Sequence, residues 1–153
     1  MLRSLLVENP NHTPLHRILT IDDHEVVRDG VKGLFGSGVA EFGEARSGAE
    51  AIGLIRDHDW DVAILDISLA GRSGLDLLKE IKQLRPKLPV LILSMHAEDQ
   101  YAMRAFKAGA AGYITKASSR RELQEAVLKV IKGGRYVSPS LAERMVFDLN
   151  TSE

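Results

Sequence analysis

Residues 61–68 read DVAILDIS, and this stretch decides the fold. Its centre, Val62 to Leu65, is apolar at every position instead of alternating with polar residues, which is typical of a strand covered on both faces. Short apolar runs appear five times along the chain, at residues 17–21, 39–45, 61–65, 89–94 and 112–115. Because a longer segment of helical period follows each run, the sequence predicts an open, mostly parallel α/β sheet.

The helical segments carry their own signals. Val27, Val31, Leu34 and Phe35 recur at i, i+4, i+7 and i+8, which predicts one buried stripe on a helix. Two S-x-x-E motifs predict capped helix starts, at Ser47 and at Ser119.

We divide the chain into three parts. Residues 1–16 are expected to form a loosely ordered extension, residues 17–133 the domain, and residues 134–153 a linker with a short helix. Ser138 as N-cap and Pro139 at the first helical position predict the start of that helix. It either packs on the domain or connects it to a further part.

Composition excludes several classes of protein. The 153 residues are 44% hydrophobic and 27% charged, which is typical of a globular protein with one core. A net charge of −1 provides no overall attraction for nucleic acid or anionic lipid. With no cysteine, thiolate metal sites and disulfides are excluded, and no apolar run is long enough to cross a bilayer. We therefore expect a cytoplasmic protein without membrane contact.

Polar side chains follow four of the apolar runs directly. They are Asp22, Asp23, Asp66, Ser94 and Lys116. Ligands bind at the carboxyl ends of strands in an open parallel sheet, so these side chains are expected to share one rim. Three carboxylates that lie close together need a counter-charge, and oxygen ligands without cysteine favour Mg²⁺ over zinc. A carboxylate there could act as a nucleophile and form an aspartyl phosphate.

Each of these residues also has a plainer interpretation. Asp at a strand end is a common helix N-cap, Ser94 could be an ordinary turn residue, and Lys116 a solvated surface charge. The functional prediction therefore depends on the whole set occurring together at four strand ends.

Four segments resemble those of a known family: ILTIDDHEVVRDGV, AILDISLAGRSGLDLL, VLILSMHAE and GAAGYITK. In this order they resemble the receiver domain of bacterial two-component response regulators, from about residue 17 to residue 133. The resemblance implies a phosphorylation-dependent signalling switch. It also implies a flavodoxin-like (CheY-like) doubly wound fold, with a five-stranded parallel sheet of order 2-1-3-4-5 flanked by five helices.

The resemblance implies a role for each residue of the expected site. Asp66 resembles the phosphoacceptor and Asp23 a direct Mg²⁺ ligand. Asp22 resembles an acid that acts on the ion largely through water, and the main-chain carbonyl of Ser68 would be the third protein ligand.

The remaining roles concern the switch. Lys116 resembles the ion-pairing lysine and Ser94 the switch hydroxyl, whose movement would leave room for Tyr113 to turn inward. The alternative for Tyr113 is an aromatic packed at the sheet edge. Switching would alter the surface of the fourth helix, around residues 98–108, together with the fifth strand and fifth helix.

The family's behaviour implies the partners. A sensor histidine kinase would donate the phosphoryl group, and catalysis would be limited to self-catalysed transfer and autodephosphorylation, so the chain is not expected to be an enzyme. The segment GYITKAS and the tail GGRYVSPSLAERM resemble the NarL/FixJ subfamily, which usually continues into a LuxR-type helix-turn-helix. DNA contact is therefore expected only through a domain that this chain lacks, and a phosphorylation-dependent homodimer could form.

Two positions depart from the usual receiver pattern. Many receivers have proline where this chain has Ala70 and Ala117, and alanine after Lys116 makes a cis peptide less favourable there.

Other functions remain open or are excluded. A stand-alone receiver that relays or sinks phosphoryl groups, or a receiver-like binding module without phosphorylation, are the alternatives. A dehalogenase-type phosphatase would need a second carboxylate two residues after its nucleophile, where this chain has Ser68. A nucleotide cofactor is not expected, because no glycine-rich phosphate loop follows the first strand. The histidines, including His24, His58 and His96, are expected to form no metal site.

Overall fold

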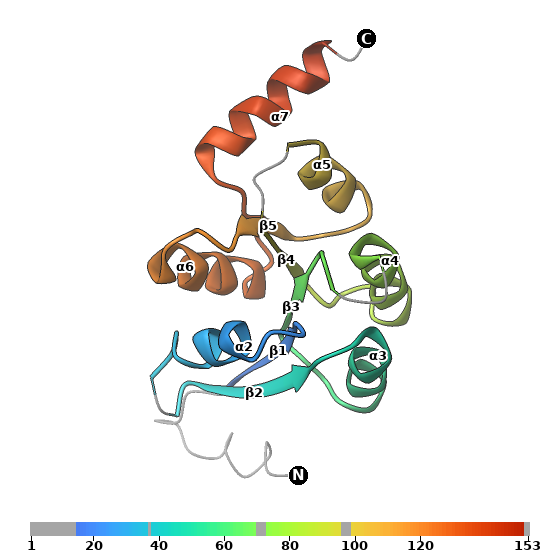
Figure 1. The fold of residues 1–153 in the computed structure, drawn as a ribbon, viewed down its shortest axis with the longest axis vertical. Helices are drawn as coiled ribbons and strands as arrows, with labels where there is room; N and C mark the ends of the chain where they lie inside the picture. The colour runs from blue at the N-terminus through green and yellow to red at the C-terminus, as the bar shows by residue number, and fades with distance from the viewer. Residues whose placement is uncertain (1–14, 37, 70–72, 96–98, 152–153) are drawn as a thin grey trace.

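The computed structural model describes residues 15–36, 38–69, 73–95 and 99–151, and Figure 1 shows their arrangement. Five strands form one parallel sheet in the order β2-β1-β3-β4-β5. The strands are β1 (His16–Ile21), β2 (Ala40–Ala45), β3 (Val62–Asp66), β4 (Val90–Ser94) and β5 (Gly112–Thr115). The predicted sheet and its strand order are confirmed.

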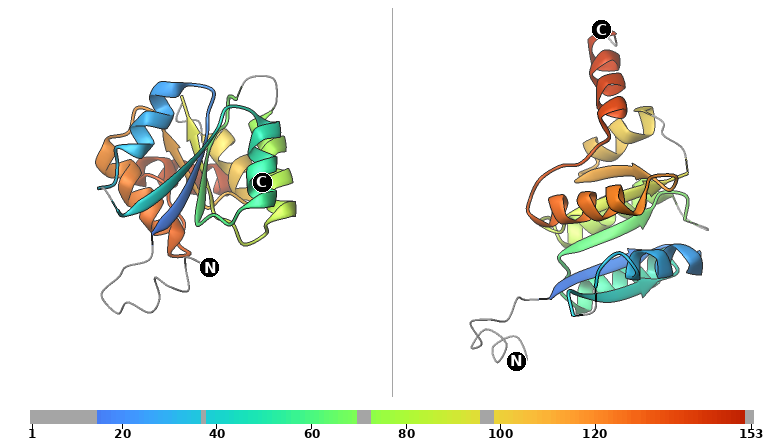
Figure 2. Two further views of the ribbon diagram at one scale, coloured as in Figure 1. Left: turned by 90° about the horizontal axis from the view of Figure 1, so that it is seen from below. Right: turned by 90° about the vertical axis from the view of Figure 1, so that its left-hand side faces the viewer.

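Six helices lie among the described residues. They are α2 (Glu25–Lys32), α3 (Gly48–Asp57), α4 (Gly74–Leu84), α5 (Asp99–Lys107), α6 (Arg120–Ile131) and α7 (Pro139–Thr151). Figure 2 shows α2 and α6 on one face of the sheet and α3, α4 and α5 on the other. The five helices expected around the sheet are therefore present, and α7 is the additional helix at the end of the chain.

The central strands are buried on both faces because two cores enclose them. In β3, Ala63 and Leu65 belong to the core beneath α3, α4 and α5, whereas Val62 and Ile64 belong to the core beneath α2 and α6. All of β3 is buried, which explains why its sequence shows no polar alternation.

The predicted helix starts are present. The Ser47 hydroxyl accepts a hydrogen bond from the Glu50 N–H at 3.2 Å, and the Ser119 hydroxyl accepts one from the Glu122 N–H at 3.1 Å. These bonds satisfy donors that a helix leaves exposed in its first turn.

Helix α7 shows one of the two roles considered for it, and the connecting role stays a prediction. Its first turn packs on the domain, where Leu141 is buried in the core next to α5 and Met145 packs against that core. Figures 1 and 2 show the rest of the helix extending beyond the sheet. Ser138 caps it, since its hydroxyl accepts from the Leu141 N–H at 3.3 Å.

One expected boundary is wrong by a residue. His16 was assigned to the N-terminal extension, but its N–H donates to the Val39 carbonyl at 3.1 Å and it is the first residue of β1. The expectation of loose order for residues 1–14 lies outside the described residues. In the part of the chain that the structure describes, every helix is too short or too polar to cross a membrane.

Candidate functional site

The sheet brings four chain segments to one rim. Asp22 follows β1, Asp66 ends β3, Ser94 ends β4 and Lys116 follows β5. The strand ladders extend into the rim, because the Asp22 N–H donates to Ala45 at 3.0 Å and the Lys116 N–H donates to Ser94 at 2.7 Å. Main-chain hydrogen bonds therefore fix the backbone positions from which these side chains extend.

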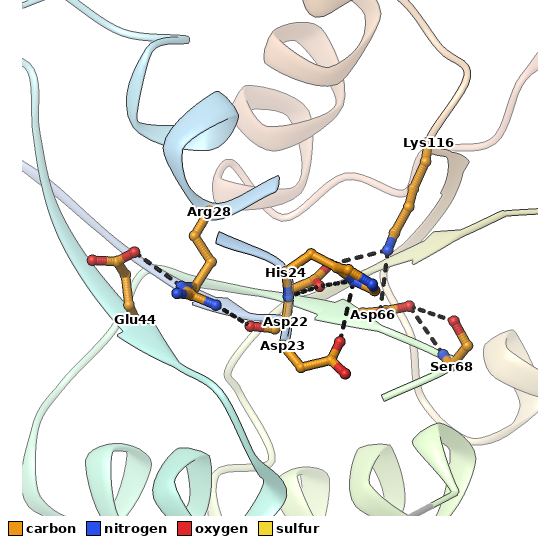
Figure 3. A network of polar contacts seen from close by, with 8 residues as sticks. All are labelled: Asp22, Asp23, His24, Arg28, Glu44, Asp66, Ser68 and Lys116. Carbon is orange, nitrogen blue, oxygen red and sulfur yellow. Dashed lines mark hydrogen bonds and ion pairs between the residues drawn. The ribbon is translucent and has the colours of Figure 1, made fainter. Parts of the chain in front are cut away.

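Lys116 joins the two deeply buried carboxylates. Its Nζ lies 3.1 Å from Oδ2 of Asp22 and 3.2 Å from Oδ2 of Asp66, and both acids are fully buried (Figure 3). Neither of these oxygens has a hydrogen bond, so the ammonium contacts them as an ion pair. The interpretation of Lys116 as a solvated surface charge is wrong, since only 13% of its side chain is exposed.

The second oxygens of the two buried acids are held by matching local turns. Oδ1 of Asp66 accepts from the Ser68 N–H at 3.0 Å and from the Ser68 hydroxyl at 2.9 Å. Oδ1 of Asp22 accepts from the His24 N–H at 2.8 Å. Such bonds from an Asp to the backbone two residues on are typical of Asx turns. The N-cap residues of the helices that follow are His24 and Ser73, so the N-cap interpretation of these aspartates is wrong.

The loop after Asp66 is held against α4. Gly74, the first residue of α4, approaches the backbone of Ile67 so closely that a Cβ would collide with the Ile67 carbonyl. Glycine at this position therefore lets α4 begin directly beneath the loop that carries Ser68.

The charges around Lys116 keep it protonated. Burial by itself lowers the pKa of Lys116, but contact with Asp22 and the negative charges of Asp66 and Asp22 outweigh burial, and the pKa is raised above its ordinary value of 10.5. One ammonium cannot balance Asp22, Asp23 and Asp66 together, so the cluster retains an excess of negative charge.

A second ion-pair network supports the acidic segment from behind. Arg28, on α2, is nearly buried; its Nη1 donates to the main-chain carbonyl of Asp22 at 2.8 Å and its Nε to Glu44 at 3.1 Å (Figure 3). Lys32 also lies 2.7 Å from Glu44. Lys32 and then Arg28 lower the pKa of Glu44. This network ties α2 and β2 to the end of β1.

The cluster is compatible with a divalent metal ion. Asp22, Asp23, His24 and Asp66 each offer one ligand atom, and these atoms lie within 4.8 Å of one another. Two carboxylate oxygens in the site are buried without a hydrogen bond and share one ammonium, so they would gain from a bound cation. The donor set therefore fits a hard divalent cation.

His24 lies within the acidic cluster, although the sequence predicts that the histidines form no metal site. Its Nδ1 lies 2.9 Å from Oδ1 of Asp22 and 3.2 Å from Oδ1 of Asp23. Its position directly after the acidic pair was the signal that the sequence offered. Arg28 was also missed, because nothing in the sequence placed it beside Glu44. His58 lies far away at the end of α3, and His96 lies outside the described residues.

The two expected switch residues are both buried. Ser94 ends β4 and is paired with Thr115 of β5, while Tyr113 is only 1% exposed and lies in the core beneath α5. Tyr113 is thus already directed inward, and its movement remains a prediction. The peptide after Lys116 is trans, as alanine at position 117 predicts, and Ala70 lies outside the described residues.

The fold and this rim define a class of protein. The chain matches the response regulator receiver domain over residues 18–128, and it belongs to that family. Receiver domains are regulatory and not metabolic enzymes, which agrees with the expectation from the sequence.

The curated relatives that this chain matches are consistent with its resemblance to the NarL/FixJ subfamily. The response regulator GacA of Pseudomonas protegens is 33% identical over 133 residues, covering 86% of this chain and 62% of the relative. The response regulator UvrY of Escherichia coli is 32% identical, covering 84% of this chain and 60% of the relative. The chain therefore spans about three fifths of the length of these relatives.

Solved structures show the same fold. A LuxR-family response regulator from Aurantimonas has a TM-score of 0.81 and 34% identity, and the match covers 88% of this chain and 98% of that one. A CheY-like receiver domain protein from Methanospirillum hungatei has a TM-score of 0.73 and 27% identity, with 78% and 96% covered.

Proposed function

We propose that this receiver domain accepts a phosphoryl group on Asp66 with the aid of Mg²⁺. The observation that carries the proposal is the Asp66 carboxylate, which is fully buried, contacts the Lys116 ammonium at 3.2 Å and belongs to a cluster of possible metal ligands. A buried carboxylate that serves only the fold has no need of two further acids beside it.

The residues of the cluster would contact Mg²⁺ in different ways. Asp23, Asp66 and the main-chain carbonyl of Ser68 would hold Mg²⁺, and Asp22 would act on it through water. When bound, the ion supplies positive charge that neutralises phosphoryl oxygens during transfer. Ser68 also orients Asp66 by donating two hydrogen bonds to Oδ1. Oδ2 has no hydrogen bond and contacts the Lys116 ammonium, so it would act as the nucleophile as Lys116 turns toward a phosphoryl oxygen.

The transfer itself would be a displacement at phosphorus. An Asp66 oxygen would form the new P–O bond while the P–N bond of a kinase phosphohistidine breaks, and the imidazole would leave with the electron pair. Lys116 would then pair with a phosphoryl oxygen in place of a carboxylate, and Ser94 would donate a hydrogen bond to another. Hydrolysis of the acyl phosphate would end the signal.

Switching would pass from the rim to one surface. Ser94 and Tyr113 lie on neighbouring strands, and Tyr113 packs into the core beneath α5. A shift of Ser94 toward the phosphoryl group would alter the surface of α5, β5 and α6. A homodimer that forms on phosphorylation could use this surface.

Further partners belong to the same proposal. In the cytoplasm, a sensor histidine kinase would be the donor, and a DNA-binding domain outside these residues would be the output. The support is the likeness to the response regulator GacA and to a LuxR-family response regulator of known structure. A stand-alone relay and a binding module without phosphorylation remain the competing functions.

Phosphorylation can be tested directly. The protein is incubated with acetyl phosphate and Mg²⁺, and intact-mass spectrometry should show one added phosphoryl group. Asp66→Asn should abolish the addition, whereas Asp57→Asn, at an exposed acid on α3, should retain it. Absence of modification in the wild type with Mg²⁺, or its persistence in Asp66→Asn, would contradict the proposal.

A further inference from the structure

His24 occupies an unusual position at the acidic cluster. It is the N-cap residue of α2, with extended backbone at φ −97° and ψ 117°, but its side chain makes no capping hydrogen bond. Ser, Thr, Asp and Asn are favoured at N-caps because their side chains satisfy helix donors. The imidazole contributes nothing of this kind to α2, so capping does not account for its orientation.

The ring is instead directed into the cluster, as Figure 3 shows. Nδ1 lies 2.9 Å from Oδ1 of Asp22 and 3.2 Å from Oδ1 of Asp23. The His24 N–H donates to the same Asp22 oxygen at 2.8 Å, which fixes the backbone from which the ring extends. Backbone and side chain together hold Nδ1 over the carboxylates.

The distances suit a shared metal ion. Imidazole nitrogen and carboxylate oxygen bind transition metals at about 2.0–2.2 Å, so two ligands of one ion lie up to roughly 4.4 Å apart. The ligand atoms of Asp22, Asp23, His24 and Asp66 already lie within 4.8 Å of one another. The His24 side chain is 64% exposed, so its ring has room to adjust as an ion binds.

The ring can also supply the required lone pair. A neutral imidazole carries its proton on one ring nitrogen and a lone pair on the other. A metal ligand at Nδ1 needs the tautomer with the proton on Nε2. Since the ring is mostly exposed, solvent can satisfy that N–H without burying a polar group.

We propose that His24 is a metal-ligating side chain and that it makes this site select transition-metal dications, such as Co²⁺, over Mg²⁺. The inference rests on the proposed function, because the ion occupies the same site. Imidazole nitrogen suits borderline transition metals, whereas Mg²⁺ prefers oxygen ligands and retains its water. An oxygen-only site favours Co²⁺ less strongly than a site with one imidazole.

The test compares direct binding of two ions. Calorimetric titration with Co²⁺ and with Mg²⁺ gives two dissociation constants for the wild type, His24→Ala and His58→Ala. His58 is exposed at the far end of α3, so its variant controls for adventitious binding of Co²⁺ to surface imidazoles. His24→Ala should lower the preference for Co²⁺ by roughly tenfold or more, the size of effect typical of altered metal shells, and His58→Ala should leave it unchanged.

A spectroscopic measurement removes a remaining ambiguity, since His24→Ala could change affinity merely by opening the site. Mn²⁺ bound to the wild type should show electron spin-echo modulation from an imidazole ¹⁴N, and this modulation should be lost in His24→Ala. An unchanged Co²⁺ preference, or bound Mn²⁺ without ¹⁴N modulation, would overturn the inference.

The two proposals fail in different ways. If Mg²⁺ supports phosphorylation of Asp66 but the Co²⁺ preference does not depend on His24, only the inference about His24 is wrong. If the wild type binds neither ion, the metal-dependent function and the role of His24 fall together.

Discussion

Replacing Lys116 by Met should destabilise the fold, because two carboxylates would remain buried without their counter-charge. Nζ lies 3.1 Å from Asp22 and 3.2 Å from Asp66. At these separations each attraction is about 5 kcal/mol with an effective dielectric constant of 20, before the cost of removing the ions from water. Removing one partner of a buried pair costs about 3–5 kcal/mol net. Because the ammonium retains some solvent contact, we expect the lower end, about 3 kcal/mol.

Urea denaturation at pH 7 without divalent cations measures this loss as a lower transition midpoint at unchanged slope. Lys107→Met removes an exposed lysine from the end of α5 and should change the free energy of unfolding by less than about 0.5 kcal/mol. A loss below about 1 kcal/mol in Lys116→Met would show that the pair behaves like a surface salt bridge, and the reasoning would be refuted.

The pH dependence gives the same prediction a second readout. The pKa of Lys116 is raised in the folded protein above its ordinary value of 10.5. The charged lysine therefore stabilises the fold fully below pH 10.5, and this contribution is lost as the pH rises through the folded pKa. The stability difference between wild type and Lys116→Met should stay constant from pH 7 to pH 9 and narrow above pH 10.5. A stability difference that widens above pH 10.5 would contradict the raised pKa of Lys116 in the folded protein.

Three further changes test other parts of the structure by urea denaturation. Arg28→Met should cost about 2 kcal/mol, since it leaves the buried carbonyl of Asp22 without its charged donor; no loss would show that Arg28 does not hold this segment. Leu141→Ala should cost roughly 2–5 kcal/mol and loosen α7, and hydrogen exchange confined to α7 would report the loosening. Glu44 has a lowered pKa, so it stabilises the fold above pH 4.5, and the stability advantage of wild type over Glu44→Gln should shrink as the pH falls below that value.

The sheet could be predicted because its determinants are local. Most strands contain a short apolar run, and a strand such as β3, buried on both faces, needs no polar alternation to be recognised. Once the strands are predicted, their carboxyl ends are predicted too. Because these ends share one edge of a parallel sheet, Asp22, Asp66 and Lys116 are expected to meet at one rim, as they do. The strand order came from the family resemblance, since local patterns contain no information on which strands are neighbours.

What the sequence could not reveal depends on register and rotamer. Arg28 and Glu44 meet because α2 lies against the end of β1 while β2 pairs with β1 in one particular register, with Thr20 opposite Glu44. A charged residue on a helix is otherwise most simply an exposed one. His24 likewise could have pointed to solvent, and only the turn closed by Asp22 directs its ring toward the acids.

The site is built from interactions that a protein selected only for stability would avoid. Asp22 and Asp66 are fully buried, and replacing a buried ion pair by apolar side chains often leaves stability unchanged or improves it. Here one ammonium serves two carboxylates and a third acid lies beside them, so the fold tolerates uncompensated negative charge. A cation entering this rim would relieve that charge, and an anion that follows the cation would find Lys116 already protonated. The same imbalance of charge that costs stability would therefore favour the binding of the proposed metal ion and phosphoryl group together.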